Sequence, residues 1–147
     1  MQNVECTPLL HSALDIAAVQ IAADGVRLEN GAERQEEALQ IRNVPFQVVD
    51  WSQVPPAEHP GESGVATWRT VQADNIRVRI VDYSPGYLAD HWCRKGHVLL
   101  VLEGELETEL QDGRTFTLTP GVSYQVEDEA VPHRSYTRTG ARLFIVD

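Results

Sequence analysis

The alternation of apolar and polar side chains in the larger part of this chain limits the folds that it can adopt. From about Phe46 onward, apolar residues recur at every second position, as a β-strand with one buried face requires. In residues 76–82, isoleucines and valines alternate with two arginines, and residues 105–110 place Leu106 and Leu110 on the face opposite three glutamates. The same period returns in 114–119 and 122–126, and a mostly apolar run fills 142–146.

Residues typical of tight turns separate these segments. They are Pro85-Gly86, Gly104, Asp112-Gly113, Pro120-Gly121 and Thr139-Gly140. Many short strands at close, regular spacing predict an all-β sandwich or barrel. The segment 97–104 is apolar at both parities, so we expect its strand to be buried on both faces, with one face meeting a second subunit.

Residues 1–42 have a different character, with much Ala, Glu and Gln and few aromatic residues. Apolar positions between 10 and 21 fall on one helical stripe, and 32–42 fits a second, polar helix. A competing interpretation is a hairpin, because residues 19–28 alternate around Asp24-Gly25. We favour a short helical N-terminal extension, accessory to a single domain that spans 43–147.

Charge and composition exclude several classes of protein. The chain has 147 residues and a formal net charge of −10, so its surface repels nucleic-acid phosphates and anionic membranes. No apolar run approaches the roughly 18 residues that a membrane-spanning helix needs. The first residues lack the basic start of a secretory signal, and two cysteines give no disulfide framework. We therefore expect a cytoplasmic protein without nucleic-acid or membrane partners.

Histidine and cysteine cluster at one place in the sequence. His91, Cys93 and His97 lie within seven positions, and His133 follows a proline at the start of a later predicted strand. In a regular strand, His91 and Cys93 would share a face, and His97 would open the next strand. The four residues fit a metal site, but a reactive thiol with nearby bases, or a polar turn, fits the spacing as well. The other two histidines, at positions 11 and 59, are interpreted as surface residues.

The segment 85–106 resembles the first motif of the cupin superfamily, and 120–134 resembles the second. In this resemblance Gly86 matches the opening glycine, His91 the first histidine and His133 the histidine of the second motif. Cys93 stands where the second histidine belongs, and His97 where the glutamate belongs. The segments GYLADHWC, KGH, LEGEL and PHRS are similar to the small bacterial DHCW-motif cupins over residues 43–147.

This resemblance implies a jelly-roll barrel that holds one divalent transition metal through His91, Cys93, His97 and His133. A thiolate in place of an imidazole favours Zn²⁺ or Fe²⁺, with copper also compatible, over Mn²⁺ or Mg²⁺. Three functions then stand open. They are a small enzyme whose metal activates O₂, water or a carbonyl, a non-catalytic module that binds metal or a small molecule, and a barrel without metal and with a free Cys93.

The remaining expectations concern the substrate and the assembly. Four aromatic residues are available to line a pocket for a small-molecule ligand or substrate, although we interpret most of them as core residues: Trp68, Tyr83, Tyr87 and Tyr124. Arg94 and Lys95 either attract an anionic substrate to this pocket or form a solvated turn. The apolar segment 97–104, together with the resemblance, predicts a homodimer.

Overall fold

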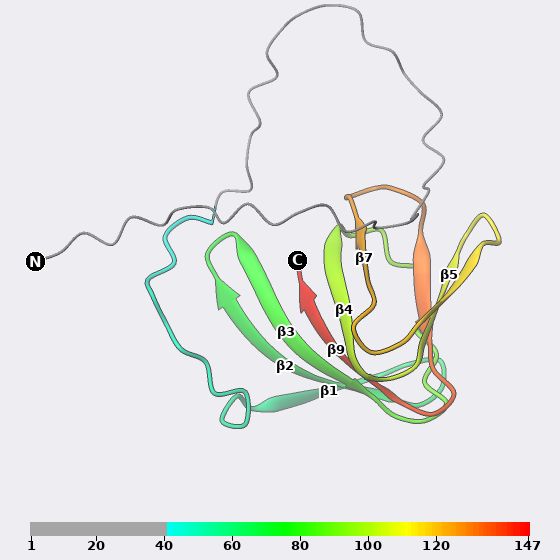
Figure 1. Ribbon diagram of the computed structural model, residues 1–147, viewed down its shortest axis with the longest axis horizontal. Coiled ribbons are helices and arrows are strands. Elements are labelled where there is room, and N and C mark those ends of the chain that lie inside the picture. Colours follow the sequence, from blue (N-terminus) through cyan, green and yellow to red (C-terminus); the bar gives the residue numbers. More distant parts are fainter. Residues whose placement is uncertain (1–40) are drawn as a thin grey trace, which may run out of the picture. The chain divides into compact units, whose positions relative to one another are not determined.

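The computed structural model describes residues 41–147, and this part of the chain is built entirely from β-strands and loops (Figure 1). The strands are β1 (Pro56–Pro60), β2 (Val65–Ala73), β3 (Ile76–Tyr83), β4 (His97–Gly104), β5 (Leu106–Leu110), β6 (Thr115–Leu118), β7 (Ser123–Val126), β8 (His133–Tyr136) and β9 (Ala141–Val146). The helices and the hairpin considered for the N-terminal extension lie outside the described residues, apart from positions 41 and 42. Within residues 41–147, no helix is long and apolar enough to cross a membrane.

The strands form two antiparallel sheets. One has the order β1-β2-β3-β9-β4-β7 and the other the order β6-β5-β8. Figure 1 shows the two sheets on opposite sides of a common interior. The alternating segments predicted β3 and the later strands correctly, and the all-β barrel is confirmed. Strands β1 and β2 were not among the predicted segments. The sequence of β1, PAEHP, contains two prolines, which an edge strand can accommodate because they lack a backbone donor.

The apolar core lies between the two sheets. It is formed by Ala66, Val81, Tyr87, Leu99, Val101, Leu106, Leu118, Ala141, Leu143 and Ile145. Leucine and valine side chains at these positions are almost completely removed from water, which is the main source of stability for a domain of this size.

Strand β3 directs its arginines toward the interior. Its alternation is confirmed, but the face that carries Arg79 and Val81 is the inner one, and Arg79 is buried. The opposite face carries Val78 and Ile80, which pair in register with Val146 and Phe144 of β9. The sheet therefore has a second, outer apolar face, and its inner face is charged at one end.

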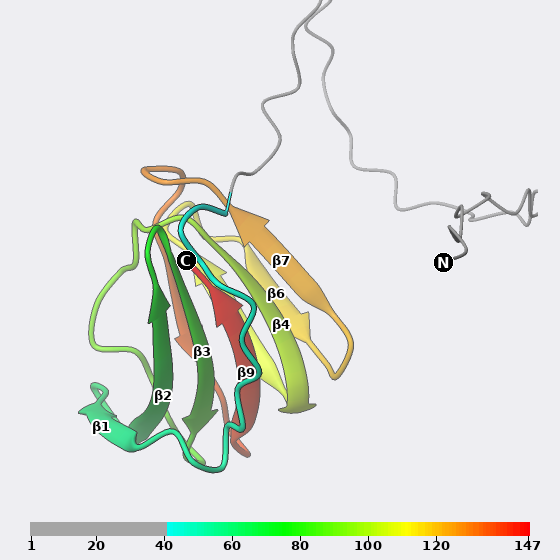
Figure 2. The same cartoon turned by 90° about the vertical axis from the view of Figure 1, so that its left-hand side faces the viewer.

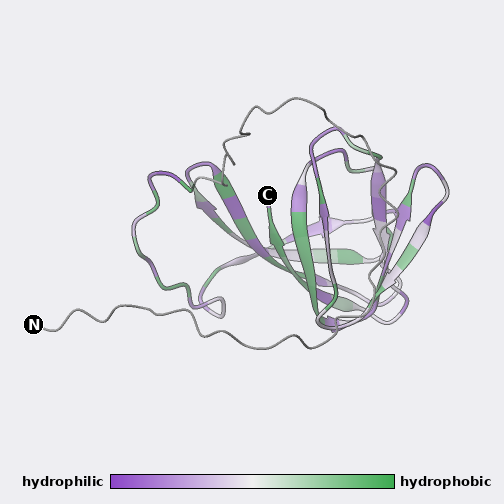
Figure 3. Ribbon diagram, turned by 45° about the horizontal axis from the view of Figure 1, so that its top comes forward, coloured by the Kyte–Doolittle hydropathy of each residue, from purple (hydrophilic) through white to green (hydrophobic). Residues whose placement is uncertain are grey.

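The outer face continues onto β4. Val98 and Leu102 are 45% and 38% exposed, whereas Leu99 and Val101 on the inner face are buried. In Figure 2 the described residues before β1, drawn in cyan, pass in front of β9 on this outer side. Figure 3 shows that β9, next to the C label, has a mainly hydrophobic colour. Within the described residues, β4 is thus buried on its inner face and only partly covered on its outer face.

Candidate metal centre

The segment between β3 and β4 places a thiol beside a histidine of the opposite sheet. Residues 89–96 do not form a regular strand; Cys93 instead makes an isolated antiparallel bridge with His133. The amide of Cys93 donates to the carbonyl of His133 over 2.7 Å, and the amide of His133 donates back over 3.1 Å. Directly paired residues of antiparallel strands direct their side chains to the same side, so this bridge brings the two side chains together.

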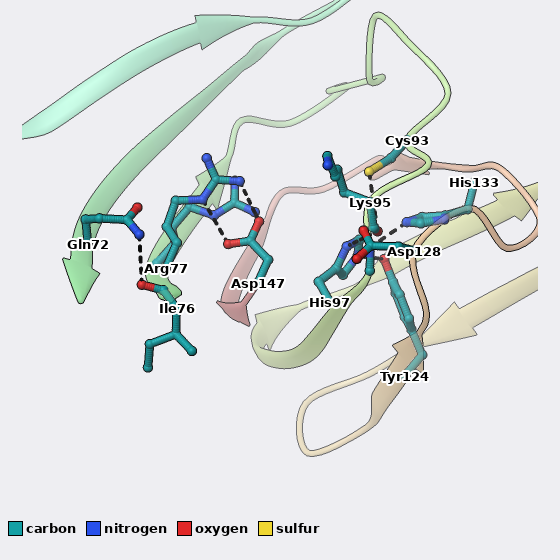
Figure 4. Close-up of polar contacts among 12 residues, drawn as sticks. Gln72, Ile76, Arg77, Cys93, Lys95, His97, Tyr124, Asp128, His133 and Asp147 are labelled. Atoms are coloured by element: carbon teal, nitrogen blue, oxygen red, sulfur yellow. Dashed lines mark hydrogen bonds and ion pairs between the residues drawn. The ribbon is translucent and has the colours of Figure 1, made fainter. Parts of the chain in front are cut away.

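His97 joins them from the first position of β4. Its side chain has the inward parity of Leu99 and Val101. The donor atoms of Cys93, His97 and His133 all lie within 4.8 Å of one another. Three elements therefore contribute one donor each: the loop before β4, the start of β4 and the start of β8 (Figure 4).

Hydrogen bonds fix which nitrogen of His97 is available. The Nδ1 atom lies 3.0 Å from the carbonyl oxygen of Lys95, which can only accept, so Nδ1 carries the proton. The Nε2 atom of His97 then carries the lone pair, and it accepts a hydrogen bond from the Tyr124 hydroxyl over 2.8 Å. The Nε2 atom of His133 lies 3.3 Å from the Nε2 atom of His97.

Burial keeps both imidazoles neutral. It lowers the pKa of His97 from 6.5 to about 4, with a further lowering by the neighbouring His133. Burial also lowers the pKa of His133, against a hydrogen bond to the backbone of Val131 that raises it. A hydrogen bond from the remote nitrogen to a backbone carbonyl is the usual arrangement of a metal-bound histidine. Both side chains are consequently prepared to bind a cation through Nε2.

His91 lies outside this group of three. Its side chain is 72% exposed, and its Nδ1 atom lies 2.6 Å from Oδ1 of Asp90. The expected shared face with Cys93 presupposed a regular strand, which residues 89–96 do not form. His91 nevertheless lines the same cavity as the three donors. His59, interpreted from the sequence as a surface residue, is exposed in β1 and stacks on Trp68 with ring centroids 3.9 Å apart.

The three donors open into a cavity of about 180 Å³ that is lined by charged, aromatic and aliphatic side chains. Trp68, Tyr83 and Tyr87 line it and also belong to or pack against the apolar core, and Tyr124 contacts it through His97. Lys95 also lines it, whereas Arg94 lies 4.0 Å from Glu129 in an exposed ion pair.

Sequence reasoning missed four charged residues of this cavity: Arg77, Arg79, Arg134 and Asp147. Asp147 accepts hydrogen bonds from the guanidinium groups of Arg77 and Arg79 (Figure 4 shows its contact with Arg77). The alternation of Arg77 and Arg79 with apolar residues in β3 indicated a polar face, but it did not indicate which side of the sheet this face occupies.

The donor set fits a transition metal. The three residues offer one sulfur and two imidazole nitrogens, which are donors that Zn²⁺ and Fe²⁺ accept. Mg²⁺ prefers carboxylate oxygens, and this group of three contains none. The two Nε2 atoms lie 3.3 Å apart, and a cation bound by both would replace the hydrogen bond from the Tyr124 hydroxyl to His97 Nε2. The geometry therefore supports the metal, although the metal's identity is not determined by it.

Comparisons with known proteins agree with the architecture. Neither the protein-family models nor the curated proteins give a match for this sequence. Among solved structures, an RmlC-like cupin from Shewanella frigidimarina is 21% identical, with a TM-score of 0.57 over 71% of this chain and 91% of that one. Ectoine synthase from P. lautus is 18% identical, with a TM-score of 0.57 over 69% and 76% of the two chains.

A third similar structure is Fe(II)-HppE with the alternative substrate (S)-1-HPP. It is 18% identical, with a TM-score of 0.56 over 69% of this chain and 60% of that chain. At these identities the likeness concerns the fold. The described part of this chain has the cupin fold, a jelly-roll barrel of two antiparallel sheets.

Proposed function

We propose that this protein is a metal-binding cupin whose metal is held by Cys93, His97 and His133. The observation that carries the proposal is the convergence of two neutral imidazoles, whose Nε2 atoms lie 3.3 Å apart, with one thiol, all donor atoms within 4.8 Å of one another. Zinc or Fe(II) is the favoured ion, and copper is also compatible with the donors. An ion held by these residues would supply Lewis-acid chemistry, or redox chemistry where it is iron or copper.

Three protein donors leave a coordination position for a further ligand. Catalytic zinc sites keep such a position, whereas structural sites are closed by four protein ligands. The cavity in front of the donors gives a small molecule access to this position. We infer a small metal-dependent enzyme, of the oxygenase, hydrolase or isomerase type, acting on a small molecule.

His91 distinguishes this proposal from a non-catalytic module. It was matched to the first histidine of the cupin motif, and it lines the cavity, so rotation away from Asp90 could make it the fourth ligand. A centre closed by His91 would have no position for substrate. This alternative function predicts that His91→Ala lowers metal affinity as strongly as His97→Ala does.

The metal proposal is tested by metal analysis of protein purified without oxygen, followed by titration of the metal-free protein with Zn²⁺ and Co²⁺. We expect one ion per chain, a sulfur-to-cobalt absorption band, and loss of binding in His97→Ala and His133→Ala. His59→Ala is the matched control, because His59 lies in β1 outside the donor group. Equal binding by the control and the two variants would reject the site.

For the assembly we propose a homodimer in a thiol-reducing compartment such as the cytoplasm. The exposed outer positions of β4, Val98 and Leu102, support the contact between subunits. A half-buried, unpaired Cys93 supports a reducing environment, since oxidation would remove its donor capacity.

A further inference from the structure

The cavity next to the three donors has a second charged wall. Arg77 and Arg79 extend into it from β3, and Asp147 follows the end of β9. In Figure 4 the Asp147 side chain lies between the Arg77 guanidinium and His97. The metal donors and these charged groups therefore share one enclosure.

Two guanidinium groups share one carboxylate in this wall. Arg77 donates through Nε to Oδ1 over 2.9 Å and through a terminal nitrogen to Oδ2 over 2.6 Å, and Arg79 donates to the same Oδ2 over 2.6 Å. Burial opposes ionisation of Asp147, but the hydrogen bond from Arg77 and the two positive charges outweigh it and lower its pKa. Two positive charges thus face one negative charge.

The other described residues of the cavity do not balance this charge. Lys95 adds another positive charge, Arg134 is already paired with Glu109 over 2.8 Å, and the two tyrosines in the wall are neutral. The chain as a whole carries a net charge of −10, so this interior is positive within an acidic protein. A metal dication with one thiolate would make it more positive.

Arg79 is buried without full hydrogen bonding. Its side chain is 8% exposed, its guanidinium lies 4.5 Å above the Trp68 ring, and its Nε has no acceptor among the described residues. The indole nitrogen of Trp68 is buried and likewise lacks an acceptor. Unpaired buried donors each cost about 1–3 kcal/mol, and charged donors cost more. These unpaired donors show that the protein alone does not fully satisfy the polar groups around Arg79.

We propose that this cavity binds a small carboxylate, held by Arg77 and Arg79 on the inner face of β3. The planar guanidinium pairs well with a carboxylate, and Arg79 is held in place by Trp68. At about 180 Å³ the cavity is smaller than the usual 300–1,000 Å³ of drug-sized ligand sites, so the ligand has few heavy atoms. With its carboxylate at the arginines, its other end faces the metal donors.

The inference deepens the proposed function by naming the substrate class, and it rests on that function only for the role of the metal. The anion site itself uses residues of β3 and β9 and needs no metal. A purely structural explanation is that Asp147 connects β3 to β9 through the two arginines. That explanation predicts no ligand and no selectivity for charge.

The experiment is a titration of the full-length protein with propionate and with propionamide, its neutral equivalent of similar shape. Binding is followed by the indole N–H resonance of Trp68, assigned with Trp68→Phe, in both the metal-free and the zinc-loaded protein. We expect propionate alone to shift this resonance. Equal shifts by the acid and the amide would overturn the proposal.

Three variants identify the charges that act. Arg77→Gln, at a side chain that is 40% exposed and so tolerant of change, should weaken propionate binding about tenfold, the loss of one charged hydrogen-bonding partner. Asp147→Asn should strengthen it, because a competing carboxylate is removed. Arg69→Gln is the control, since Arg69 pairs with Asp82 in β2 and β3 and does not line the cavity.

The two proposals can fail separately. Propionate that binds only to the zinc form and equally to Arg77→Gln would sit on the metal, which overturns the arginine site and keeps the metal site. Arginine-dependent binding in a protein that holds no zinc would keep the arginine site and reject the metal. An Arg77→Gln variant with the melting temperature and the propionate affinity of the wild type would also overturn the carboxylate site.

Discussion

The single sulfur donor decides which ions the candidate centre prefers. Cys93 replaces an imidazole of the usual cupin motif, and it approaches His133 through a backbone bridge that does not involve its side chain. Changing the side chain therefore changes the donor and leaves its position intact. The effect of the donor atom's softness can therefore be measured at Cys93 without moving the backbone that positions it.

We expect Cys93→Ser to fold normally and to bind Zn²⁺ more weakly by more than about 100-fold, the upper range for loss of an outer-shell partner. A hydroxyl is a poor donor for a soft ion, so the preference should move toward harder ions. Competition titration with a chromophoric chelator measures the affinity, and circular dichroism checks the fold. Cys93→His, which restores the common motif, should recover binding. Unchanged zinc affinity in the serine variant would show that Cys93 is not a ligand.

The neutral imidazoles predict an acid-sensitive metal-free protein. Because the pKa of His97 is about 4 in the folded state and 6.5 as a free group, the folded state binds fewer protons between these values. The stability from neutral His97 is thus fully present above pH 6.5 and is lost as the pH falls toward 4. Full linkage would lower the free energy of unfolding by roughly 1.4 kcal/mol for each pH unit between the two pKa values. Because His97 is partly exposed, we expect a smaller total loss of about 1–2 kcal/mol.

Urea unfolding of the metal-free protein at pH 7 and pH 5 measures this loss. His97→Gln should show a smaller difference, with the remainder from His133, whose pKa is also lowered by burial. A variant with the same pH dependence as the wild type would mean that His97 is not the group responsible.

At the scale of elements, the local sequence pattern predicted where strands occur. Which face of a strand points inward depends on pairing with residues far away in the sequence. The alternation in β3, β5, β6 and β7 was visible in the sequence because it is a property of consecutive residues. That Arg79 points inward depends on Asp147, sixty-eight positions away, and on the register between β3 and β9. No short pattern in the sequence encodes that pairing.

The candidate site was predictable to the same extent. Cys93, His97 and His133 were identified by residue type and resemblance, and the structure brings them together. The orientation of His91 depends on the irregular backbone of 89–96 and on its contact with Asp90, so the parity rule for strands did not apply. The position of Arg77 and Arg79 in the cavity was not predicted, because charged residues are expected on the solvent side of a strand.

The connection between β4 and β5 gives a test of how the chain passes from one sheet to the other. Gly104 has φ of +77°, and a Cβ there would clash with the backbone of Gly140. Gly113 has φ of +93° but open space around it. We expect Gly113→Ala to cost about 1 kcal/mol of strain and Gly104→Ala clearly more, about 3 kcal/mol, because a steric clash adds to the strain. Chemical denaturation measures both, and equal costs would contradict the clash.

At the scale of the whole molecule, the outer apolar face of the six-stranded sheet needs a cover. Val98 and Leu102 on β4 are partly exposed, and Phe144 and Val146 of β9 lie on the same side in register. Contiguous apolar surface on a protein of otherwise high charge marks a contact site. A symmetric contact between two such faces would give a two-fold dimer.

If the proposed dimer forms through this face, Leu102→Glu should convert it to a monomer, because the substitution places a charge in the apolar contact. Val131→Glu is the matched control: Val131 is 37% exposed and Leu102 38%, but Val131 lies in the loop before β8. Light scattering on the full chain and the two variants measures the mass. Dimers in all three would place the interface elsewhere.

Deletion of residues 1–42 separates a partner subunit from the extension as the cover of this face. The strands and all the candidate ligands follow residue 42, so the shortened chain should fold and keep its metal. If a partner covers β4, the full chain and the shortened chain are both dimers. If the extension covers it, the full chain is a monomer and only the deletion associates, since the removal exposes the apolar strand face. We expect the first result, because Val98 and Leu102 on one subunit offer a self-complementary surface to the same residues on another.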